Sequence, residues 1–518
     1  MLYYLRVFRR IATILFVLAK HKSLFFLRRI HPLISIPIFC VELLFCWKIT
    51  KKSDGKRLTE ALYELGPVFI KVGQAVAVRS DIVGDDISRD LSRLQDRLPA
   101  HSFSDIRKII DKELDGKVED IFADFQQRPV AAASISQVHF AKLKSGEDVA
   151  VKILRPNIER KFKRDIELLY FIARTLNKMS SKVHRLKLEK IIEDFEQTVN
   201  FELDLKMEAA AASELKENTK NDKDFKVPDV YWDYTSSRVL TVEKIHGIRI
   251  DNIAKLKEEG HDLGEILVKA SNIFFYQVYR DGFFHADMHP GNLFVGKNGE
   301  IIAVDFGIMG RVDLKNRIFL AEILIGFLNR DYKKVSEVHF EAGYIPDDQD
   351  KELFAQAARS IGEPIFGKSQ GEISLAKVLA QLFKVSEQFN METQPQLILL
   401  QKTMVLAEGL GRKLDTNVNF WELSKPLVEE WCKKNLGPEA KAKYVACELK
   451  QASRRLNKIL QSADNLDNII TKDGLKLHPK TLEYFKKHKR SRANLPFILF
   501  SSSITLIIIL LFILISHK

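Results

Sequence analysis

The segment from residue 285 to residue 307 constrains the fold of this chain most strongly. It reads HADMHPGN at 285–292, and Asp305-Phe-Gly follows after two short apolar stretches. An Asp and an Asn five positions apart supply a carboxylate and an amide oxygen, and a second Asp arrives on a separate turn. Oxygen ligands of this kind suit a divalent metal that neutralises nucleotide phosphates. The segment therefore predicts two loops that converge on a phosphate site, with short strands near 293–295 and 301–304 between them.

This order of residues is typical of the catalytic loop and metal-binding turn of kinase-type phosphotransferases. We therefore assign Asp287 as the catalytic residue and Asn292 and Asp305 as metal ligands. We expect Gly307 to let the chain turn sharply after Asp305. The plainer alternative, that these are capping and turn residues, fits less well because the loop, the strand and the second turn occur in the expected order.

A lysine that binds the α- and β-phosphates is expected upstream. Lys152 ends the sequence VAVK on a strand predicted at 148–154. Its carboxylate partner must come from the helical pattern over 188–220, which carries Glu202, Asp204 and Glu208. Asp204 and Glu208 are four residues apart and would share a helix face, whereas Glu202 lies off that face. We choose Glu208 as the partner of Lys152, with Glu202 as the runner-up.

The loop that should cover the phosphates departs from the usual glycine-rich pattern and is rich in alanine. Alanine does not reach positive φ as easily as glycine, and its methyl group limits close approach, so altered nucleotide geometry and slower or different transfer are expected. We predict nucleotide contacts from Lys152, from Glu243 on a strand predicted at 239–245, and from the loop residues Ala131, Ala132, Ala133, Ser134, Ile135, Ser136, Gln137 and Val138.

Together these motifs resemble the UbiB family of atypical kinase-like proteins, which act in ubiquinone (coenzyme Q) biosynthesis. The family's KxGQ motif is present as Lys71-Val-Gly73-Gln74, and all motifs follow in family order over roughly residues 57–420. The resemblance implies ATP or ADP and Mg²⁺ as cofactors, and ATPase-type activity rather than ordinary protein phosphorylation. It also implies that the KxGQ helix lies where a protein substrate would bind, with Glu202 and Asp204 as its acidic partners.

The expected fold class is α+β, a bilobal protein-kinase-like fold with a helical N-terminal extension over the active site. We expect a basic membrane-interface segment (1–52), a helical KxGQ extension (53–125), an N-lobe (126–246), a C-lobe (247–420), a helical basic tail (421–492) and one transmembrane helix (497–515). Helices are expected at 58–78, with a break at Gly66-Pro67, and at 91–98, 104–114 and 158–179. The four cysteines, Cys40, Cys46, Cys432 and Cys447, are too few for a disulfide framework, and buried thiols are expected.

The positive charge of the chain is terminal. Residues 1–52 carry ten Lys or Arg and one acid, residues 484–518 carry six basic residues and no acid, and residues 53–483 hold 65 basic and 67 acidic residues. The net charge of +13 over 518 residues therefore does not indicate a nucleic-acid binder, which would more often show a basic face on its folded domain. Basic segments beside apolar ones favour an anionic membrane surface.

The two ends differ in how they would meet a membrane. Residues 497–515 contain no charge, are just long enough to cross the ~30 Å hydrocarbon core, and follow a basic flank that should stay cytoplasmic. The N-terminus is interrupted by arginines, which favours a helix lying in the interface, with a solvated helical face or an organelle presequence as alternatives. Neutralising Arg9, Arg10, Arg28 and Arg29 is then expected to weaken membrane association and to leave nucleotide binding intact.

We therefore expect a membrane-anchored atypical kinase or ATPase that helps prenylated quinone precursors reach biosynthetic enzymes. Its partners would be anionic lipids, those precursors and other ubiquinone-biosynthesis proteins, at a bacterial inner membrane or, alternatively, a mitochondrial one. A protein or small-molecule phosphotransferase is the second hypothesis, and a non-catalytic nucleotide-binding scaffold is the third.

Overall fold

The computed structural model describes residues 2–24, 52–77, 84–91, 99–179, 188–365, 395–415 and 420–436, with shorter pieces at 381, 384–386, 388–391, 470–471 and 474–475. The chain divides into two compact units, residues 1–434 and 435–518. The described part of the second unit comprises residues 435–436, at the end of a helix, and a pair of short antiparallel strands, β12 (Ile470–Thr471) and β13 (Gly474–Leu475). All that follows concerns the first unit.

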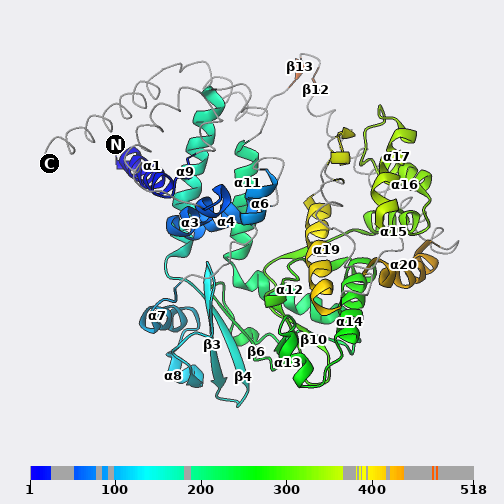
Figure 1. Cartoon of the computed structure of the whole chain (residues 1–518). Helices are drawn as coiled ribbons and strands as arrows, with labels where there is room; N and C mark the ends of the chain where they lie inside the picture. Colours follow the sequence, from blue (N-terminus) through cyan, green and yellow to red (C-terminus); the bar gives the residue numbers. More distant parts are fainter. Residues whose placement is uncertain are drawn as a thin grey trace. The chain divides into compact units, whose positions relative to one another are not determined.

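A five-stranded antiparallel sheet forms the N-terminal lobe (Figure 1). Its path is β1 (Phe122–Phe125), β3 (Ser136–Leu143), β4 (Asp148–Leu154) and β6 (Val239–Glu243), and β2 (Ala131–Ala132) pairs with β3. Side chains alternate between the two faces of a strand. Val149, Val151 and Ile153 of β4 are therefore buried with α7 (Phe103–Glu113), and Lys152 points to the opposite face.

Helices pack above this sheet and, in the case of α12 (Leu205–Asn218), beside it (Figure 1). The others are α1 (Leu2–Lys20), α3 (Asp54–Leu65), α4 (Pro67–Ala77), α6 (Asp85–Leu91), α9 (Ile158–Met179) and α11 (Leu188–Glu202). The break predicted at Gly66-Pro67 is present between α3 and α4, and Ser102 caps α7, the helix predicted at 104–114. The helix predicted at 91–98 begins earlier, as α6, and residues 92–98 lie outside the described part of the chain.

The continuous helix expected over 188–220 is wrong, because the chain breaks between α11 and α12. Asp204 has extended backbone angles and its carboxylate accepts a hydrogen bond from the amide of Lys206, so it is the N-cap of α12. An aspartate at this place satisfies an amide that has no partner inside the helix. Glu202 and Glu208 consequently belong to different helices, and Asp204 does not share a helix face with Glu208.

Helix α1 is part of the folded body rather than only a membrane segment. Val17, Leu18 and Ala19 are buried among residues of α3, α4 and α9. The guanidinium of Arg10 donates to the carboxylate of Asp165 on α9 at 2.6 and 3.0 Å and lies over the ring of Phe69. This face of α1 is therefore used inside the protein, and Arg10 cannot be grouped with surface arginines.

The C-terminal lobe is built on a four-stranded sheet, and its helices lie on the right of Figure 1. The strand order is β5 (Phe225–Lys226), β10 (Ile301–Ala303), β9 (Leu293–Val295) and β7 (Ile248–Arg249), and β8 (Phe283–His285) pairs separately with β11 (Met309–Arg311). The helices are α13 (Ile253–Glu258), α14 (Leu263–Phe275), α15 (Leu314–Leu328), α16 (Tyr332–Glu341), α17 (Lys351–Gly362), α19 (Pro395–Leu414) and α20 (Phe420–Leu436).

The short elements are α8 (Val118–Ile121), the 3-10 turns η2 (Trp232–Tyr234), η4 (Pro290–Asn292) and η5 (Glu363–Ile365), and the π-helical η3 (Tyr276–Asp281). The arrangement is the expected mixed helix and sheet fold with two lobes. Residues 122–125, which we placed in the helical extension, belong to the sheet because β1 pairs with β3.

Within the described ranges, no helix is both long and apolar enough to cross a bilayer. The predicted span at 497–515 lies outside those ranges, so it stays a prediction. Of the four cysteines, Cys432 is described, and its thiol is buried and free.

Candidate active site

Two short ladders bring the catalytic loop and the second aspartate loop together. Strands β8 and β11 enclose one end, and strands β9 and β10 enclose the other. The amide of Ala286 donates to the carbonyl of Ile308 at 3.0 Å, and the amide of Val304 donates to the carbonyl of Asn292 at 2.9 Å. The loops at 286–292 and 304–308 therefore run side by side, as the sequence predicts.

The catalytic loop holds Asp287 and Asn292 against each other. The amide nitrogen of Asn292 donates to the backbone carbonyl of Asp287 at 3.1 Å and to its carboxylate at 3.0 Å. This bond turns the amide oxygen of Asn292 away from Asp287. The oxygen is thus left available for a metal ion.

The ring of His285 links the two loops, because it contacts the backbone of each. Its Nδ1 accepts a hydrogen bond from the amide of Asp287 at 3.2 Å, and its Nε2 lies 3.3 Å from the carbonyl of Val304, so the proton belongs on Nε2. The ring is buried, and burial lowers the pKa of His285. A neutral imidazole therefore fixes the spacing between the loops.

Asp305 and Gly307 share the turn that follows β10. The chain bends at Gly307 as expected, although Gly307 is outside the left-handed region, and Asp305 has φ of +63°. An aspartate tolerates this region better than most residues, and such strain gathers at functional sites. The strained backbone aims the half-exposed carboxylate of Asp305 at Lys152, whose Nζ lies 3.1 Å away.

The ion pair that we predicted between Lys152 and Glu208 is present. Nζ of Lys152 donates to the two carboxylate oxygens of Glu208 at 2.8 and 2.9 Å. Burial alone would lower the pKa of Lys152, but the carboxylates of Asp305 and Glu208 outweigh it and hold that pKa above its ordinary value. Burial likewise favours the neutral form of Asp305, but Lys152 prevails and lowers the pKa of Asp305 to about 2.

Glu202, the runner-up, pairs with the KxGQ motif instead. Its carboxylate lies 2.8 Å from Nζ of Lys71, and both side chains are almost fully buried. The charge of Lys71 also reaches Asp305, whose pKa it helps to lower. Gly73 is buried and Gln74 half-buried on the same helix, α4. Asp204, the other expected acidic partner, caps α12 as described above.

The alanine-rich loop is tightly fixed by Arg155. Its guanidinium donates to the carbonyl of Ala133 at 2.9 and 2.6 Å and to that of Pro99 at 2.9 Å. The backbone amide of Arg155 also donates to the carbonyl of Ile135. Arg155, which the sequence did not point to, therefore fixes the turn between β2 and β3.

Several loop side chains that we assigned to nucleotide binding are turned inward. Ser134, Ser136 and Gln137 are buried. The amide oxygen of Gln137 accepts from the backbone of His101, and its amide nitrogen lies 2.8 Å from Nε2 of His139. Contacts to a nucleotide from these positions would have to come from the backbone. Among the assigned residues that stay partly open are Ala132, Ala133 and Val138.

The side chain of Glu243 also binds other residues of the protein. Its carboxylate lies 2.5 Å from Nζ of Lys226 and accepts from the amide of Asp229. Its side chain therefore supports the end of β6, where the chain leaves the N-terminal lobe.

Helix α19 supplies two contacts that the sequence did not reveal. Nζ of Lys402 lies 3.5 Å from the carboxylate of Asp287, and the hydroxyl of Thr403 donates to the carbonyl of Ala286 at 3.1 Å. Both residues lie more than a hundred positions away from the loop they touch. A signal for them could only have come from covariation.

The donor set fits magnesium and a polyphosphate. The carboxylate of Asp305 and the amide oxygen of Asn292 are oxygen donors, which Mg²⁺ prefers, and it normally completes its shell with waters and phosphate oxygens. In the part of the chain that the structure describes, no group of three His, Cys, Asp or Glu side chains could hold a metal alone. A site made from one aspartate, one asparagine and the phosphates is consistent with that finding.

Comparisons with known proteins agree with this architecture. An ABC1 atypical kinase-like domain model matches residues 93–339, and a UbiB helical domain model matches residues 358–419. A Marinobacter nauticus protein called probable protein kinase UbiB is 43% identical over 392 residues, which is 75% of this chain and 72% of that protein. An Azotobacter vinelandii protein with the same description is 41% identical over 412 residues, 78% of this chain and 77% of that protein.

A solved structure supports the fold alone. The Mycobacterium tuberculosis protein Rv3197, determined in complex with erythromycin, matches with a TM-score of 0.51 and 24% identity over 69% of this chain and 90% of that one. The similarity to the Marinobacter and Azotobacter proteins covers most of each pair of chains, and the kinase-like motifs lie in the matched region. The chain therefore belongs to the UbiB family of atypical kinase-like proteins, and this membership implies a role in ubiquinone biosynthesis.

Proposed function

We propose that this protein binds ATP with Mg²⁺ and hydrolyses it in support of ubiquinone biosynthesis. The observation that carries the proposal is the set of contacts that joins Lys152 to Glu208 and Asp305 on one side of the site and Asn292 to Asp287 on the other. A lysine held by a helix glutamate, together with two metal-binding side chains, is the arrangement that phosphoryl transfer requires.

Each residue has a defined task in this proposal. Lys152 binds the α- and β-phosphates, and Glu208 holds its ammonium in place. Asp305 and Asn292 hold the metal, which neutralises charge on the phosphates when it is bound. Asp287 orients the attacking oxygen and accepts its proton. His285 keeps the two loops at a fixed distance while this happens.

Water is the favoured phosphate acceptor because helix α4 of the protein itself flanks the site and leaves less room for a larger substrate. Lys71 is held by Glu202, and its charge reaches Asp305, so α4 approaches the place where a substrate would enter. The alternative phosphotransferase reading needs an acceptor that passes this helix. The scaffold reading is disfavoured because the lysine, the two aspartates and the asparagine are all present.

We further propose that the protein works at a bacterial inner membrane with its kinase-like part in the cytoplasm. The basic ends of the chain, the uncharged stretch at 497–515 and the bacterial origin of the similar proteins support this. Exposed Leu5 and Phe16 on α1 offer an apolar contact for lipid. Anionic lipids, prenylated quinone precursors and other biosynthetic proteins are the proposed partners.

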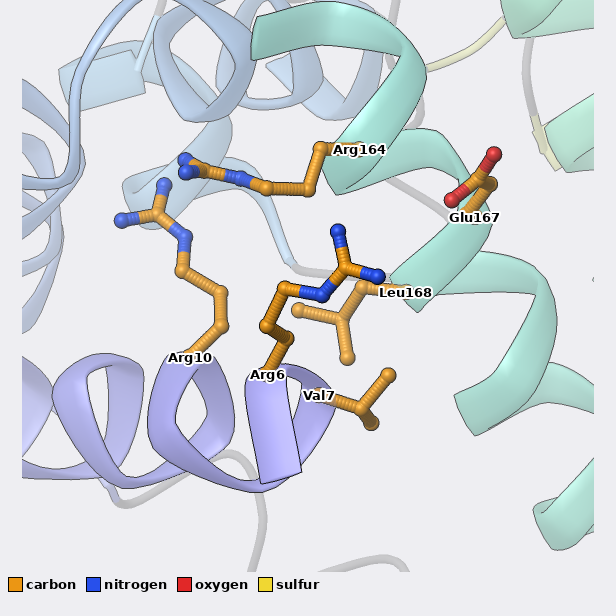
Figure 2. Close-up of a pocket in the computed structure, with 6 residues that line it drawn as sticks. All are labelled: Arg6, Val7, Arg10, Arg164, Glu167 and Leu168. Carbon is orange, nitrogen blue, oxygen red and sulfur yellow. The ribbon is translucent and has the colours of Figure 1, made fainter. Parts of the chain in front are cut away.

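A small basic pocket between α1 and α9 qualifies the part played by the N-terminal arginines. Arg6, Val7 and Arg10 of α1 face Arg164, Glu167 and Leu168 of α9 (Figure 2). Arg10 is bound to Asp165, and Glu167 lines the same pocket, so much of the positive charge is compensated within the protein. We therefore place the attraction for anionic lipid on the other basic residues of the ends.

An ATPase assay with purified full-length protein tests the proposal. Phosphate release should require Mg²⁺, should fall more than about 100-fold in Asp305→Asn because a metal ligand is lost, and should rise with anionic liposomes. Transfer of labelled γ-phosphate to added protein should stay below release to water. Equal turnover by wild type and Asp305→Asn, or equal rescue of quinone production by both in a deficient strain, would contradict the ATP-dependent function.

A further inference from the structure

Helix α19 delivers a cation to the catalytic aspartate from outside the kinase-like motifs. Lys402 lies 115 residues beyond Asp287, and its Nζ is 3.5 Å from Oδ1 of that carboxylate. Lys402 also falls within the matched UbiB helical domain, whereas Asp287 falls within the kinase-like domain. The helical domain thus reaches the reactive centre of its neighbour.

The position of Lys402 is set by a second, buried contact. Thr403, the next residue, is fully buried, and its hydroxyl donates to the carbonyl of Ala286 inside the catalytic loop. The single hydroxyl proton is shared with the carbonyl of Leu399 one turn earlier, which lies 2.8 Å from the same oxygen. Helix α19 is therefore docked on the loop backbone, and Lys402 is presented at a defined place.

The two oxygens of Asp287 have different partners. Oδ2 accepts from the amide of Asn292, and Oδ1 faces Lys402. Among the ion pairs of the described residues, Asp287 has Lys402 as its basic partner, and the loop 285–292 contains no Lys or Arg of its own. Lys402 is thus the cation that offsets the negative charge of the catalytic carboxylate.

Both side chains remain open to a ligand. Lys402 is 35% exposed and Asp287 30% exposed, in contrast to the nearly closed pair of Lys152 and Glu208. The terminal phosphate must come close to Asp287 if that carboxylate is to orient the attacking oxygen. Two anions brought this close repel each other strongly unless a cation lies beside them.

We propose that Lys402 is the cation that faces the γ-phosphate and so makes this site selective for a nucleoside triphosphate over a diphosphate. Lys152 serves the α- and β-phosphates, which both nucleotides share, and Lys402 serves the phosphate that only the triphosphate has. This assignment rests on the proposed nucleotide site and adds a specificity residue from the helical domain.

Equilibrium binding tests the assignment without relying on turnover. In Lys402→Met, full-length and with Mg²⁺, the dissociation constant of a non-hydrolysable ATP analogue should rise about tenfold, while that of ADP should change less than about twofold. Lys402→Arg keeps the charge and should stay within about threefold of wild type for both. ATP turnover at saturation should fall roughly 10- to 100-fold in Lys402→Met.

Lys413→Met is the matched control, because Lys413 is an exposed lysine in the last turn of the same helix. It should bind both nucleotides like wild type. Equal weakening of ATP analogue and ADP in Lys402→Met, or no weakening of either, overturns the role of Lys402 while the proposed function stands. Failure of the wild-type protein to bind either nucleotide overturns both.

Discussion

The two sides of the candidate site differ in how their charges are balanced. On the N-lobe side, Lys152 and Glu208 are 15% and 8% exposed and bind each other at 2.8 Å. On the catalytic-loop side, Lys402 and Asp287 are about one-third exposed and lie 3.5 Å apart. A buried pair is costly to break because the remaining charge has no water, whereas an exposed pair is easily separated by a ligand. The first side is a preformed frame, and the second side is where a ligand can rearrange the contacts.

The largest effect is expected from breaking the buried frame. Glu208→Gln removes the charge that faces Lys152 and leaves its ammonium enclosed beside Asp305 alone. The free energy of unfolding should fall by about 3–4 kcal/mol, and ATP turnover should fall with it. Denaturant unfolding and an ATPase assay measure the two effects.

Asn292→Ala supplies the contrasting variant on the open side. Its amide is half-buried at the edge of the loop, so unfolding should change by less than about 1 kcal/mol while turnover is largely lost with the metal ligand. If both variants lowered stability equally, the division into a frame and an open side would be wrong.

A smaller effect on stability is expected at the N-terminal helix α1. There, a buried ion pair and an exposed charge are found on two adjacent arginines. Arg10→Met leaves the carboxylate of Asp165, which is 3% exposed, without its main partner and should lower the free energy of unfolding by about 2–3 kcal/mol. Arg9→Met removes an exposed charge from the same helix and should change it by less than about 0.5 kcal/mol.

Binding to anionic liposomes should follow the opposite order, with Arg9→Met losing more affinity than Arg10→Met. An Arg10→Met variant as stable as wild type would show that α1 is only a surface anchor. The expected difference separates Arg10, which is paired with Asp165, from Arg9, although we first grouped both with Arg28 and Arg29.

The smallest effect is a pH dependence of stability that arises from His339, a buried side chain that stays neutral, unlike Lys152. His339 on α16 is surrounded by the rings of Tyr344 and Phe354, and this burial lowers its pKa to about 4. An unfolded histidine, near 6.5, takes up its proton first as the pH falls, so stability is full above pH 6.5 and is lost between about pH 6.5 and 4.

Comparison with His339→Phe separates the loss of stability caused by His339 from the loss caused by carboxylates that become protonated. The free energy of unfolding of wild type should fall by on the order of 2 kcal/mol more than that of His339→Phe between pH 7 and pH 4.5. Parallel pH profiles for the two proteins would show that the pKa of His339 is the same in the folded and unfolded states.

Local sequence patterns predicted much of the frame. The alternation at 148–154 predicted β4, and the helical pattern at 158–179 predicted α9, with bounds that the structure reproduces. Glu208 was chosen correctly over Glu202 for Lys152, although for an incomplete reason. The helix that was thought to carry both residues is broken at Asp204, because its side chain caps α12 more favourably than it would serve a helix interior.

The sequence by itself determined the kinase-like motifs of this protein. A lysine on a strand, an Asp and an Asn five residues apart, and a second Asp on its own turn predict a phosphate and metal site, because oxygen ligands and cations suit the charge of the phosphates. Only the tertiary structure decided which groups complete that site. Arg155 holds the alanine loop, and Lys402 and Thr403 reach the catalytic loop across more than a hundred residues. Contacts of that kind depend on how helices dock, and helix docking leaves no periodic trace in the local sequence.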